Sequence, residues 1–277
     1  MKKKRTPYKL IYICIFLTAI ILIGVLAFAV YKLNTEFIPQ QKEAKRYDEL
    51  RDVLYQAEET VAQEDGTPSS DAAPDAETTS KGEVIRTYSL EELFKMNSDM
   101  VAWLTVPDTK IDYPVMHTPD DYEYYLHTDF DGYYSFSGCL FVGENCSIDS
   151  DVFVIYGHNM NNGSMFGEID MYSYSDYMDE HRDVILRTRD GNRLYRVFAS
   201  FPTKKFDDDD NSGEFQYYNS VGKKSKTEYE KIVEDICDLS VVSVDNKPQY
   251  PAQIAFLSTC AYHEENGRFV VAAYRIR

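Results

Sequence analysis

Two runs near the C-terminus decide the fold: Ala255-Phe256-Leu257-Ser258-Thr259-Cys260 and, after a short turn-like segment, Asn266-Gly267-Arg268-Phe269-Val270-Val271. Both are rich in apolar and β-branched residues, which is typical of buried strands. The first run delivers a thiol to a strand end, and the second carries a guanidinium back beside it. Upstream, Val152-Phe153-Val154-Ile155-Tyr156-Gly157-His158 brings an imidazole to the end of another apolar strand.

Short strand-like segments recur through the rest of the chain. Pro107-Asp108-Thr109 predicts the turn of one hairpin, and Asp190-Gly191 is a strong hairpin signal for another. Helical patterns are expected over 90–97, 123–127, 165–181 and 227–239. Strands are expected over 101–106, 110–116, 138–142, 152–156, 184–188, 194–201, 252–257 and 269–276. This pattern predicts a mainly β fold with inserted helices, either a closed antiparallel barrel or a compact sandwich.

The N-terminus predicts a membrane anchor. Residues 10–30 carry no charge, and as a helix they would span roughly 30 Å, enough to cross a bilayer. The preceding basic residues predict a cytoplasmic N-terminus and an extracellular remainder, in a single-pass protein of the cell membrane. A cleaved signal peptide is the alternative, because Ala27-Phe28-Ala29 resembles a cleavage site. The length of the apolar run favours the anchor.

Composition divides the chain further. We expect a cytoplasmic basic tail over 1–9, a transmembrane anchor over 10–32, and a charged helical stalk over 33–63 that either stands alone or packs on the domain. Residues 64–83 are acidic and lack large apolar side chains, which predicts a disordered linker. The folded catalytic domain is expected over 84–277.

The formal net charge of −17 argues against nucleic acid as a partner, because binding to phosphates requires a basic face. An acidic run at Asp207-Asp208-Asp209-Asp210 lacks the spacing of an EF-hand, so a solvated loop is favoured over a calcium site. A disulfide between Cys139 and Cys146 is one alternative, although the strand-like setting of Cys139 favours a buried thiol. Cys237 lies in a helical pattern and is expected to pack.

A thiol, an imidazole and a guanidinium at strand ends supply the parts for acyl transfer through a thioester. Cys260 would attack as a thiolate, His158 would protonate the departing amine, and Arg268 or backbone N–H groups would stabilise the oxyanion. Each residue also has a plain structural interpretation: a packed thiol, a hydrogen-bonded loop histidine and a surface ion pair. Cys260 and His263 have a Cys-x-x-His spacing, but no second ligand pair lies nearby in the sequence, so zinc is not expected.

The same residues resemble the signature of the sortases, in the segments 257–260, 266–268 and 155–160. The run His158-Asn159-Met160-Asn161-Asn162-Gly163-Ser164-Met165-Phe166-Gly167 resembles class B sortases in particular. So does Val101-Ala102-Trp103-Leu104 followed by Thr109-Lys110-Ile111-Asp112-Tyr113-Pro114-Val115. The resemblance covers roughly 89–277 and implies a closed sortase-type β-barrel with inserted helices.

The resemblance implies a membrane-anchored cysteine transpeptidase. Such enzymes cleave a C-terminal sorting motif in secreted proteins and pass the acyl group to an amine, usually on a peptidoglycan precursor. It implies Cys260 as nucleophile, His158 as general acid/base and Arg268 as the oxyanion or substrate-backbone donor. Three further residues match positions near the substrate groove: Ser258, Thr259 and Tyr156. No metal and no organic cofactor are expected.

Three alternatives stay open at the level of sequence. The first is a hydrolytic cysteine peptidase, although papain-like enzymes place the cysteine before the histidine along the chain. The second is a sortase that polymerises pilins. The third is a non-catalytic membrane-anchored binding domain in which Cys260 is structural. The sorting motif, the amine acceptor and the oligomeric state are not readable from the sequence.

Overall fold

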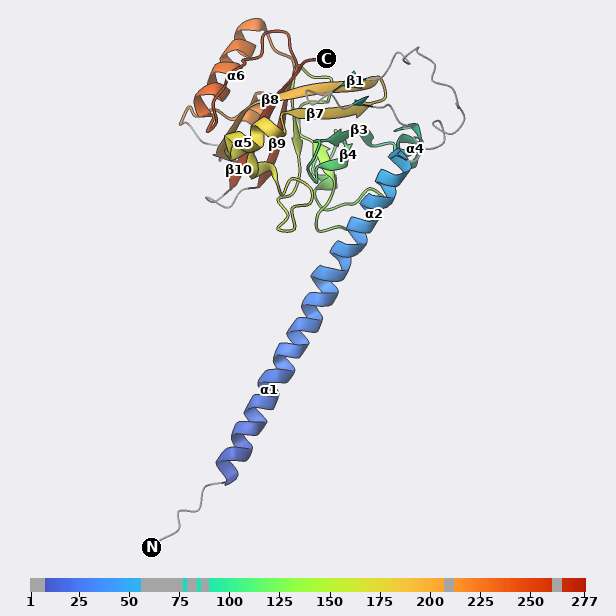
Figure 1. Cartoon of the computed structure of the whole chain (residues 1–277), viewed down its shortest axis with the longest axis vertical. Coiled ribbons are helices and arrows are strands. Elements are labelled where there is room, and N and C mark those ends of the chain that lie inside the picture. Colours follow the sequence, from blue (N-terminus) through green and yellow to red (C-terminus); the bar gives the residue numbers. More distant parts are fainter. Residues whose placement is uncertain (1–7, 56–76, 79–83, 86–89, 207–211, 261–265) are drawn as a thin grey trace. The chain divides into compact units, whose positions relative to one another are not determined.

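The computed structural model describes residues 8–55, 77–78, 84–85, 90–206, 212–260 and 266–277 (Figure 1). Contacts divide the chain into two compact units, Met1–Arg46 and Tyr47–Arg277. A short paired ribbon of β1 (Glu77–Thr78) and β2 (Val84–Ile85) belongs to the second unit. The predicted linker and the Asp207–Asp210 run fall largely or wholly outside the described residues.

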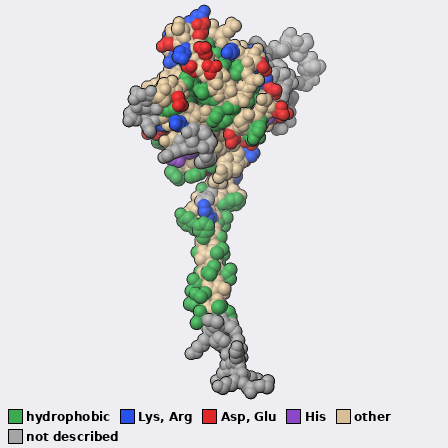
Figure 2. Space-filling model, turned by 90° about the vertical axis from the view of Figure 1, so that its left-hand side faces the viewer, with side chains coloured by type: hydrophobic (Ala, Val, Ile, Leu, Met, Phe, Trp, Pro, Cys, Tyr) green, Lys and Arg blue, Asp and Glu red, His purple; other side chains and the backbone are tan. Residues whose placement is uncertain are grey.

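The first unit is helical. It comprises α1 (Tyr8–Lys32), a π-helical turn η1 (Leu33–Phe37) and the start of α2 (Ile38–Tyr55). Its apolar side chains lie on the surface (Figure 2), and its apolar segment has a mean hydropathy of 3.0 with none of it buried. By length and composition it is a candidate membrane span, as expected for residues 10–32. A signal sequence has the same properties.

The second unit is built on a closed barrel of eight strands, in the order β10-β8-β7-β3-β4-β5-β6-β9 (Figure 1). The strands are β3 (Met100–Thr105), β4 (Asp112–Met116), β5 (Leu140–Val142), β6 (Val152–Tyr156), β7 (Asp183–Thr188), β8 (Gly191–Lys204), β9 (Ile254–Cys260) and β10 (Gly267–Arg275). The predicted barrel is therefore confirmed, and the sandwich is wrong.

The barrel is not wholly antiparallel, in contrast to the expectation. β4 pairs with β5 and β6 pairs with β9 in parallel. Both predicted hairpins are present: β3 pairs with β4, and β7 pairs with β8 up to the Thr188–Gly191 pair. Gly191 has a φ of +122° at this turn, a conformation that L side chains rarely adopt and that glycine reaches readily.

Helical segments lie before and between the strands of the barrel. They are α4 (Leu90–Met96), η2 (Tyr124–Leu126), η3 (Ile169–Ser173), α5 (Ser175–Glu180), η4 (Tyr217–Asn219) and α6 (Lys226–Leu239). The helical pattern over 165–181 thus forms two short helices rather than one. A capping box between Ser225 and Glu228 begins α6. Its apolar stripe packs against the outer face of the barrel, as helical spacing predicts.

Alternate residues of the strands form two apolar clusters. Phe153, Ile155, Leu257 and Val271 belong to the larger cluster, which extends to α2 and α4. Their neighbours Val154, Phe256 and Val270 belong to the cluster beneath α6. The two-residue period of a strand therefore separates the main core of the barrel from the helix-covered face.

The end of α2 packs on the barrel, so the compact unit begins at Tyr47, upstream of the expected boundary at residue 84. Tyr47, Leu50 and Leu54 are buried. Asp112 of β4 accepts hydrogen bonds from Tyr55 OH (3.1 Å) and Trp103 Nε1 (2.7 Å). Of the two arrangements considered for the predicted stalk, packing holds for this part of the helix.

The cysteines described with their side chains form no disulfide. Cys139 is buried and Cys146 is half-buried, and neither is joined to another described cysteine. The Cys139 sulfur lies 3.3 Å from Tyr47 OH. Cys139 is therefore the packed thiol that its strand-like setting predicted.

Candidate active site

The ends of β9 and β10 bring two of the predicted residues together. Cys260 is the antiparallel register partner of Arg268. Residues directly opposite each other in an antiparallel pair lie on the same face of a sheet, so positions 260 and 268 share one face. The register thus joins a thiol-bearing residue and a guanidinium-bearing residue at one corner of the barrel.

The end of β6 lies on the other side of β9. Tyr156 pairs with Ser258, and Gly157 N–H donates to the Ser258 carbonyl over 3.1 Å. The Thr259 hydroxyl donates in turn to the Gly157 carbonyl over 2.7 Å. The chain that leaves β6 is therefore held against β9 to within one residue of Cys260, and His158 follows at once. The strand order is β10, β9, β6, which puts the three predicted catalytic positions side by side in the order Arg268, Cys260, His158.

Gly157 is required by close packing. A Cβ at this position would lie 2.5 Å from Leu140 Cδ2 and 2.8 Å from the Phe166 ring. A side chain would force the strand end away from the barrel wall. The glycine before His158 therefore keeps the imidazole-bearing segment seated on β5 and β9.

The His158 imidazole is half-buried and fixed by one hydrogen bond. Its Nε2 lies 2.8 Å from the Leu126 carbonyl oxygen. A carbonyl only accepts, so Nε2 carries the hydrogen of the neutral ring and the lone pair is on Nδ1. Burial lowers the pKa of His158 and the charge of His127 lowers it further, while the bond to Leu126 opposes the shift. The ring is therefore predominantly neutral near pH 7 and can accept a proton at Nδ1.

Gly138 packs closely against Leu126 and holds it in place. Gly138 has a φ of +57°, and a Cβ there would lie 2.4 Å from the Leu126 carbonyl oxygen. Tyr47 OH donates to the Gly138 carbonyl over 2.6 Å. A chain of contacts thus runs from α2 through Gly138 and η2 to the imidazole.

Arg268 is half-buried and its Nη1 donates to the carbonyls of Gly267 (2.9 Å) and Asn266 (3.3 Å). Its positive charge acts on the phenols of Tyr156 and Tyr217. Burial nevertheless raises the pKa of both tyrosines, so both stay neutral. The guanidinium is the charged group at this corner among the described side chains of β9, β10 and the end of β6.

Two of the three predicted substrate-binding residues are buried. Ser258 has no exposed surface and its hydroxyl lies 2.7 Å from Tyr217 OH. Thr259 is 2% exposed and bonded to Gly157. Tyr156 stays partly exposed. Sequence reasoning missed Tyr217, because nothing in the polar loop around it signals a contact with a residue of β9 far along the chain.

A histidine that the sequence did not single out also lies here. The His127 ring is 5.3 Å from the His158 ring, centroid to centroid, and stacks on Tyr134 at 6.2 Å. Phe136 stacks on His158 at 6.3 Å. The predicted imidazole is therefore one member of a row of aromatic rings.

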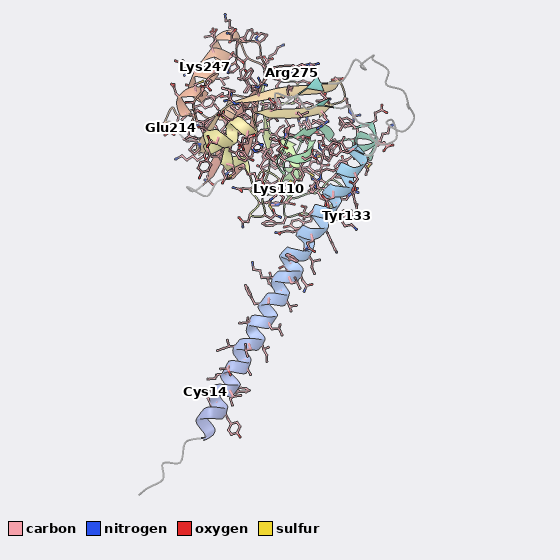
Figure 3. All side chains as sticks on the ribbon, viewed as in Figure 1. Cys14, Lys110, Tyr133, Glu214, Lys247 and Arg275 are labelled. Carbon is pink, nitrogen blue, oxygen red and sulfur yellow. The ribbon has the colours of Figure 1, made fainter. Side chains whose placement is uncertain are left out.

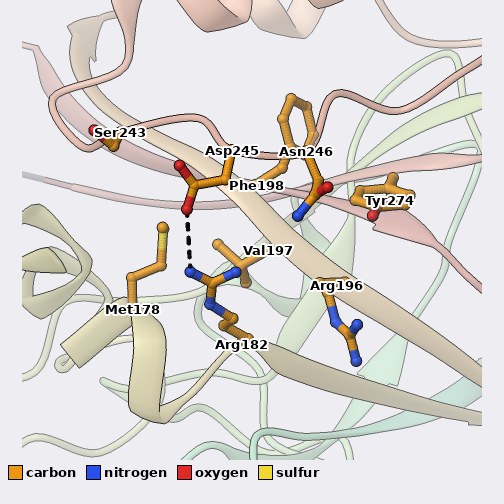
Figure 4. Close-up of a pocket in the computed structure, with 9 residues that line it drawn as sticks. All are labelled: Met178, Arg182, Arg196, Val197, Phe198, Ser243, Asp245, Asn246 and Tyr274. Atoms are coloured by element: carbon orange, nitrogen blue, oxygen red, sulfur yellow. Dashed lines mark ion pairs between the residues drawn. The ribbon is translucent and has the colours of Figure 1, made fainter. Parts of the chain in front are cut away.

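A separate recess lies between α5, β8, β10 and the segment 243–246 (Figure 4). An ion pair of 3.7 Å joins Arg182 and Asp245 across it. None of the predicted site residues lines this recess. Within the described residues no group of histidine, cysteine and carboxylate side chains could hold a metal ion.

The chain resembles known proteins over most of its length. The family model for the sortase domain matches residues 104–276. Sortase B of Listeria monocytogenes is 32% identical over 202 residues, which are 71% of this chain and 77% of that protein. Sortase B of Staphylococcus aureus is 25% identical over 192 residues, 68% and 74% of the two chains.

Solved structures resemble the fold. Sortase B of Clostridium perfringens superimposes with a TM-score of 0.59 at 28% identity, covering 68% of this chain and 99% of that one. A Staphylococcus aureus sortase B–substrate complex gives a TM-score of 0.66 at 22% identity and covers 87% and 99%.

Proposed function

This chain belongs to the sortase family of cysteine transpeptidases, with class B relatives, and we propose that it cleaves a C-terminal sorting motif in secreted proteins and transfers the acyl group to an amine of the cell wall. The supporting observation is the strand order that puts Arg268, Cys260 and His158 on three neighbouring strand ends. The proposed catalytic residues come from the sequence resemblance. A single reaction centre requires these residues to lie close together, and the register of β6, β9 and β10 is consistent with that requirement.

Cys260 acts as the nucleophile. Its thiol proton moves to Nδ1 of His158, and the thiolate sulfur bonds to the scissile carbonyl carbon. The carbonyl oxygen becomes an oxyanion. When the oxyanion collapses, the C–N bond breaks and the departing nitrogen takes the proton from His158. The product of this half-reaction is a thioester on Cys260 and a free amine.

The second half-reaction reverses the first with a different amine. The incoming amine attacks the thioester carbonyl carbon, and its surplus proton moves to His158. The C–S bond breaks, the acyl group leaves as an amide, and the thiol is restored with that proton. Water in place of the amine gives hydrolysis, so the same residues serve both outcomes and product analysis separates them.

Arg268 stabilises the oxyanion or binds the substrate backbone. A guanidinium has five N–H donors in a rigid fork, more than the two carbonyl contacts of Nη1 consume. Its register position opposite Cys260 supports a role for its positive charge beside the carbonyl oxygen that becomes negative.

Tyr156, Ser258 and Thr259 form the floor of the substrate site in this proposal. Tyr156 offers partly exposed ring surface to the peptide. Ser258 and Thr259 act indirectly, because their buried hydroxyls are bonded to Tyr217 and Gly157. Through these bonds they hold β9 in position beneath the bound peptide.

The proposal includes the membrane. With α1 as a retained anchor, the N-terminus would be cytoplasmic and the barrel extracellular. Secreted substrates are themselves held briefly at the membrane, so confining both partners to one surface raises their effective concentration.

The test is mass spectrometry of the trapped acyl-enzyme after incubation with a library of sorting-motif peptides. A thioester on Cys260, absent from Cys260→Ala, is expected. Addition of an amine should convert the hydrolysed product into an amide of that amine. A protein that never acylates, or whose products never contain the added amine, contradicts transpeptidation.

A further inference from the structure

Three exposed aromatic residues lie in the loop 133–136, and two of them, Tyr134 and Phe136, stack on the rings of His127 and His158. Tyr133 is 72% exposed, Tyr134 80% and Phe136 58%. Tyr133 lies at the edge of the barrel unit (Figure 3). Large apolar side chains that gather on a surface mark a site of interaction. We call these three residues the aromatic surface.

The loop that carries the aromatic surface is held in one conformation. Asp129 Oδ1 accepts the N–H groups of Asp131 (3.0 Å) and Tyr133 (2.8 Å), and Asp129 N–H donates to the Tyr133 carbonyl over 2.8 Å. Thr128 and Tyr134 form a β-bridge. Gly132, at a φ of +86°, makes the turn. The aromatic rings are thus presented by a preorganised loop, which lowers the entropic cost of binding.

The aromatic surface is continuous with the proposed active site. Tyr134 stacks on His127, His127 lies against His158, and Phe136 stacks on His158 from another position, with centroids 6.2, 5.3 and 6.3 Å apart. The row of rings begins at His158, which exchanges a proton with the amine in the proposed function. Arg268 lies on the opposite side of β9.

Charge indicates what this surface binds. The sequence contains no Lys or Arg between Lys110 and Arg182, and the loop itself carries Asp129 and Asp131. The loop therefore carries negative charge and no positive charge of its own, which favours a cationic ligand over an anionic lipid surface. Aromatic faces also attract ammonium groups.

We propose that the aromatic surface is the binding site for the amine acceptor, a short peptide with a primary amine. The inference rests on the proposed function. Both the leaving and the incoming nitrogen exchange a proton with His158, so the acceptor must approach from the side of that ring. A peptide whose amine lies at His158 would extend over Phe136 and Tyr134.

The experiment compares the double variant Tyr133→Ala/Tyr134→Ala with the wild-type full-length protein. A sorting-motif peptide is the donor, and triglycine and a diaminopimelate stem peptide are the acceptors. The measured quantity is the ratio of transfer to hydrolysis as a function of acceptor concentration. We expect the half-saturating acceptor concentration to rise about tenfold, because the acceptor peptide loses aromatic ring faces over which its chain extends.

Two further variants sharpen the result. Tyr174→Ala removes a tyrosine that is 63% exposed between η3 and α5, and it should leave the acceptor dependence as in wild type. Tyr134→Phe keeps the aromatic face and should retain acceptor binding, whereas Tyr134→Leu should lose it.

An acceptor dependence unchanged in the double variant overturns the inference. So does a parallel fall in thioester formation, which would assign the two tyrosines to the donor. Failure of the wild-type protein to form a thioester refutes the proposed function instead. In that case, titration of Cys260→Ala with triglycine, followed by tyrosine fluorescence, still decides whether the aromatic surface binds the ammonium peptide.

Discussion

Nε2 of His158 lies 2.8 Å from the carbonyl oxygen of Leu126, a residue 32 positions earlier in the chain. This bond fixes the tautomer of the ring and the direction in which Nδ1 presents its lone pair. The carbonyl is itself held by η2, which the close approach of Gly138 locks in place. The chemistry proposed for the imidazole therefore depends on a loop that carries no catalytic residue.

We expect the acid limb of the pH–rate profile for thioester formation to lie below pH 6.5, the ordinary pKa of histidine. Burial lowers the pKa of His158, so the neutral ring that accepts the thiol proton persists to lower pH and is lost only as pH falls through the lowered pKa. NMR titration of the His158 ring checks the assignment. A limb at or above pH 6.5 that follows His158 would contradict the proposed protonation state.

His127→Gln should move that limb upward. A protonated His127 lowers the pKa of His158, and glutamine removes the charge while keeping a polar side chain. We expect the His158 resonance to titrate at higher pH in the variant. His181→Gln is the matched control, because His181 contacts Pro107 and Tyr177 and should not affect His158. Identical His158 titrations in wild type and His127→Gln would exclude coupling of the two rings.

Arg268→Lys should reduce thioester formation by about a hundredfold, the scale of losing one oxyanion donor. Lysine keeps the charge but lacks the planar fork of donors. The measurement is the rate of thioester formation with saturating donor peptide. Arg275→Lys, at the other end of β10, serves as control. Near-normal activity of Arg268→Lys would remove Arg268 from the mechanism.

Truncation should show that α2 belongs to the catalytic unit. A chain that starts at Val84 loses three buried side chains of α2, each worth roughly 2 kcal/mol of unfolding free energy. It should melt at lower temperature than a chain that starts at Tyr47. Tyr47→Phe, which removes the hydroxyl that contacts the Gly138 carbonyl and the Cys139 sulfur, should lower the free energy of unfolding by about 1 kcal/mol. Equal melting temperatures for the two truncated chains would make the helix dispensable.

Much of the fold follows from local patterns. Val152–Tyr156 is predicted to the residue, the Asp190-Gly191 turn joins β7 and β8, and the apolar stripe of α6 packs as its spacing indicates. Each of these signals lies within one element or one turn. The ends of β6, β9 and β10 are also visible in the sequence, and the motifs of the family order them.

What the sequence did not reveal depends on contacts between remote segments. The parallel pairs β4–β5 and β6–β9 have no local signal, because hairpin turns report only antiparallel neighbours. The bond between Tyr217 and Ser258 and the approach of His127 to His158 arise only once the barrel closes. Tyr47 likewise finds Gly138 only through the closed structure.

The strand order β10, β9, β6 has a kinetic consequence under the proposed function. With the guanidinium on one side of the sulfur and the imidazole on the other, the donor peptide can bind in one direction only. Its C-terminal fragment then leaves through the site that the acceptor occupies next. The released fragment should therefore inhibit competitively with respect to the amine. When the secreted donor is abundant, the replacement of the released fragment by the acceptor amine, rather than cleavage of the peptide bond, would then limit the rate of turnover.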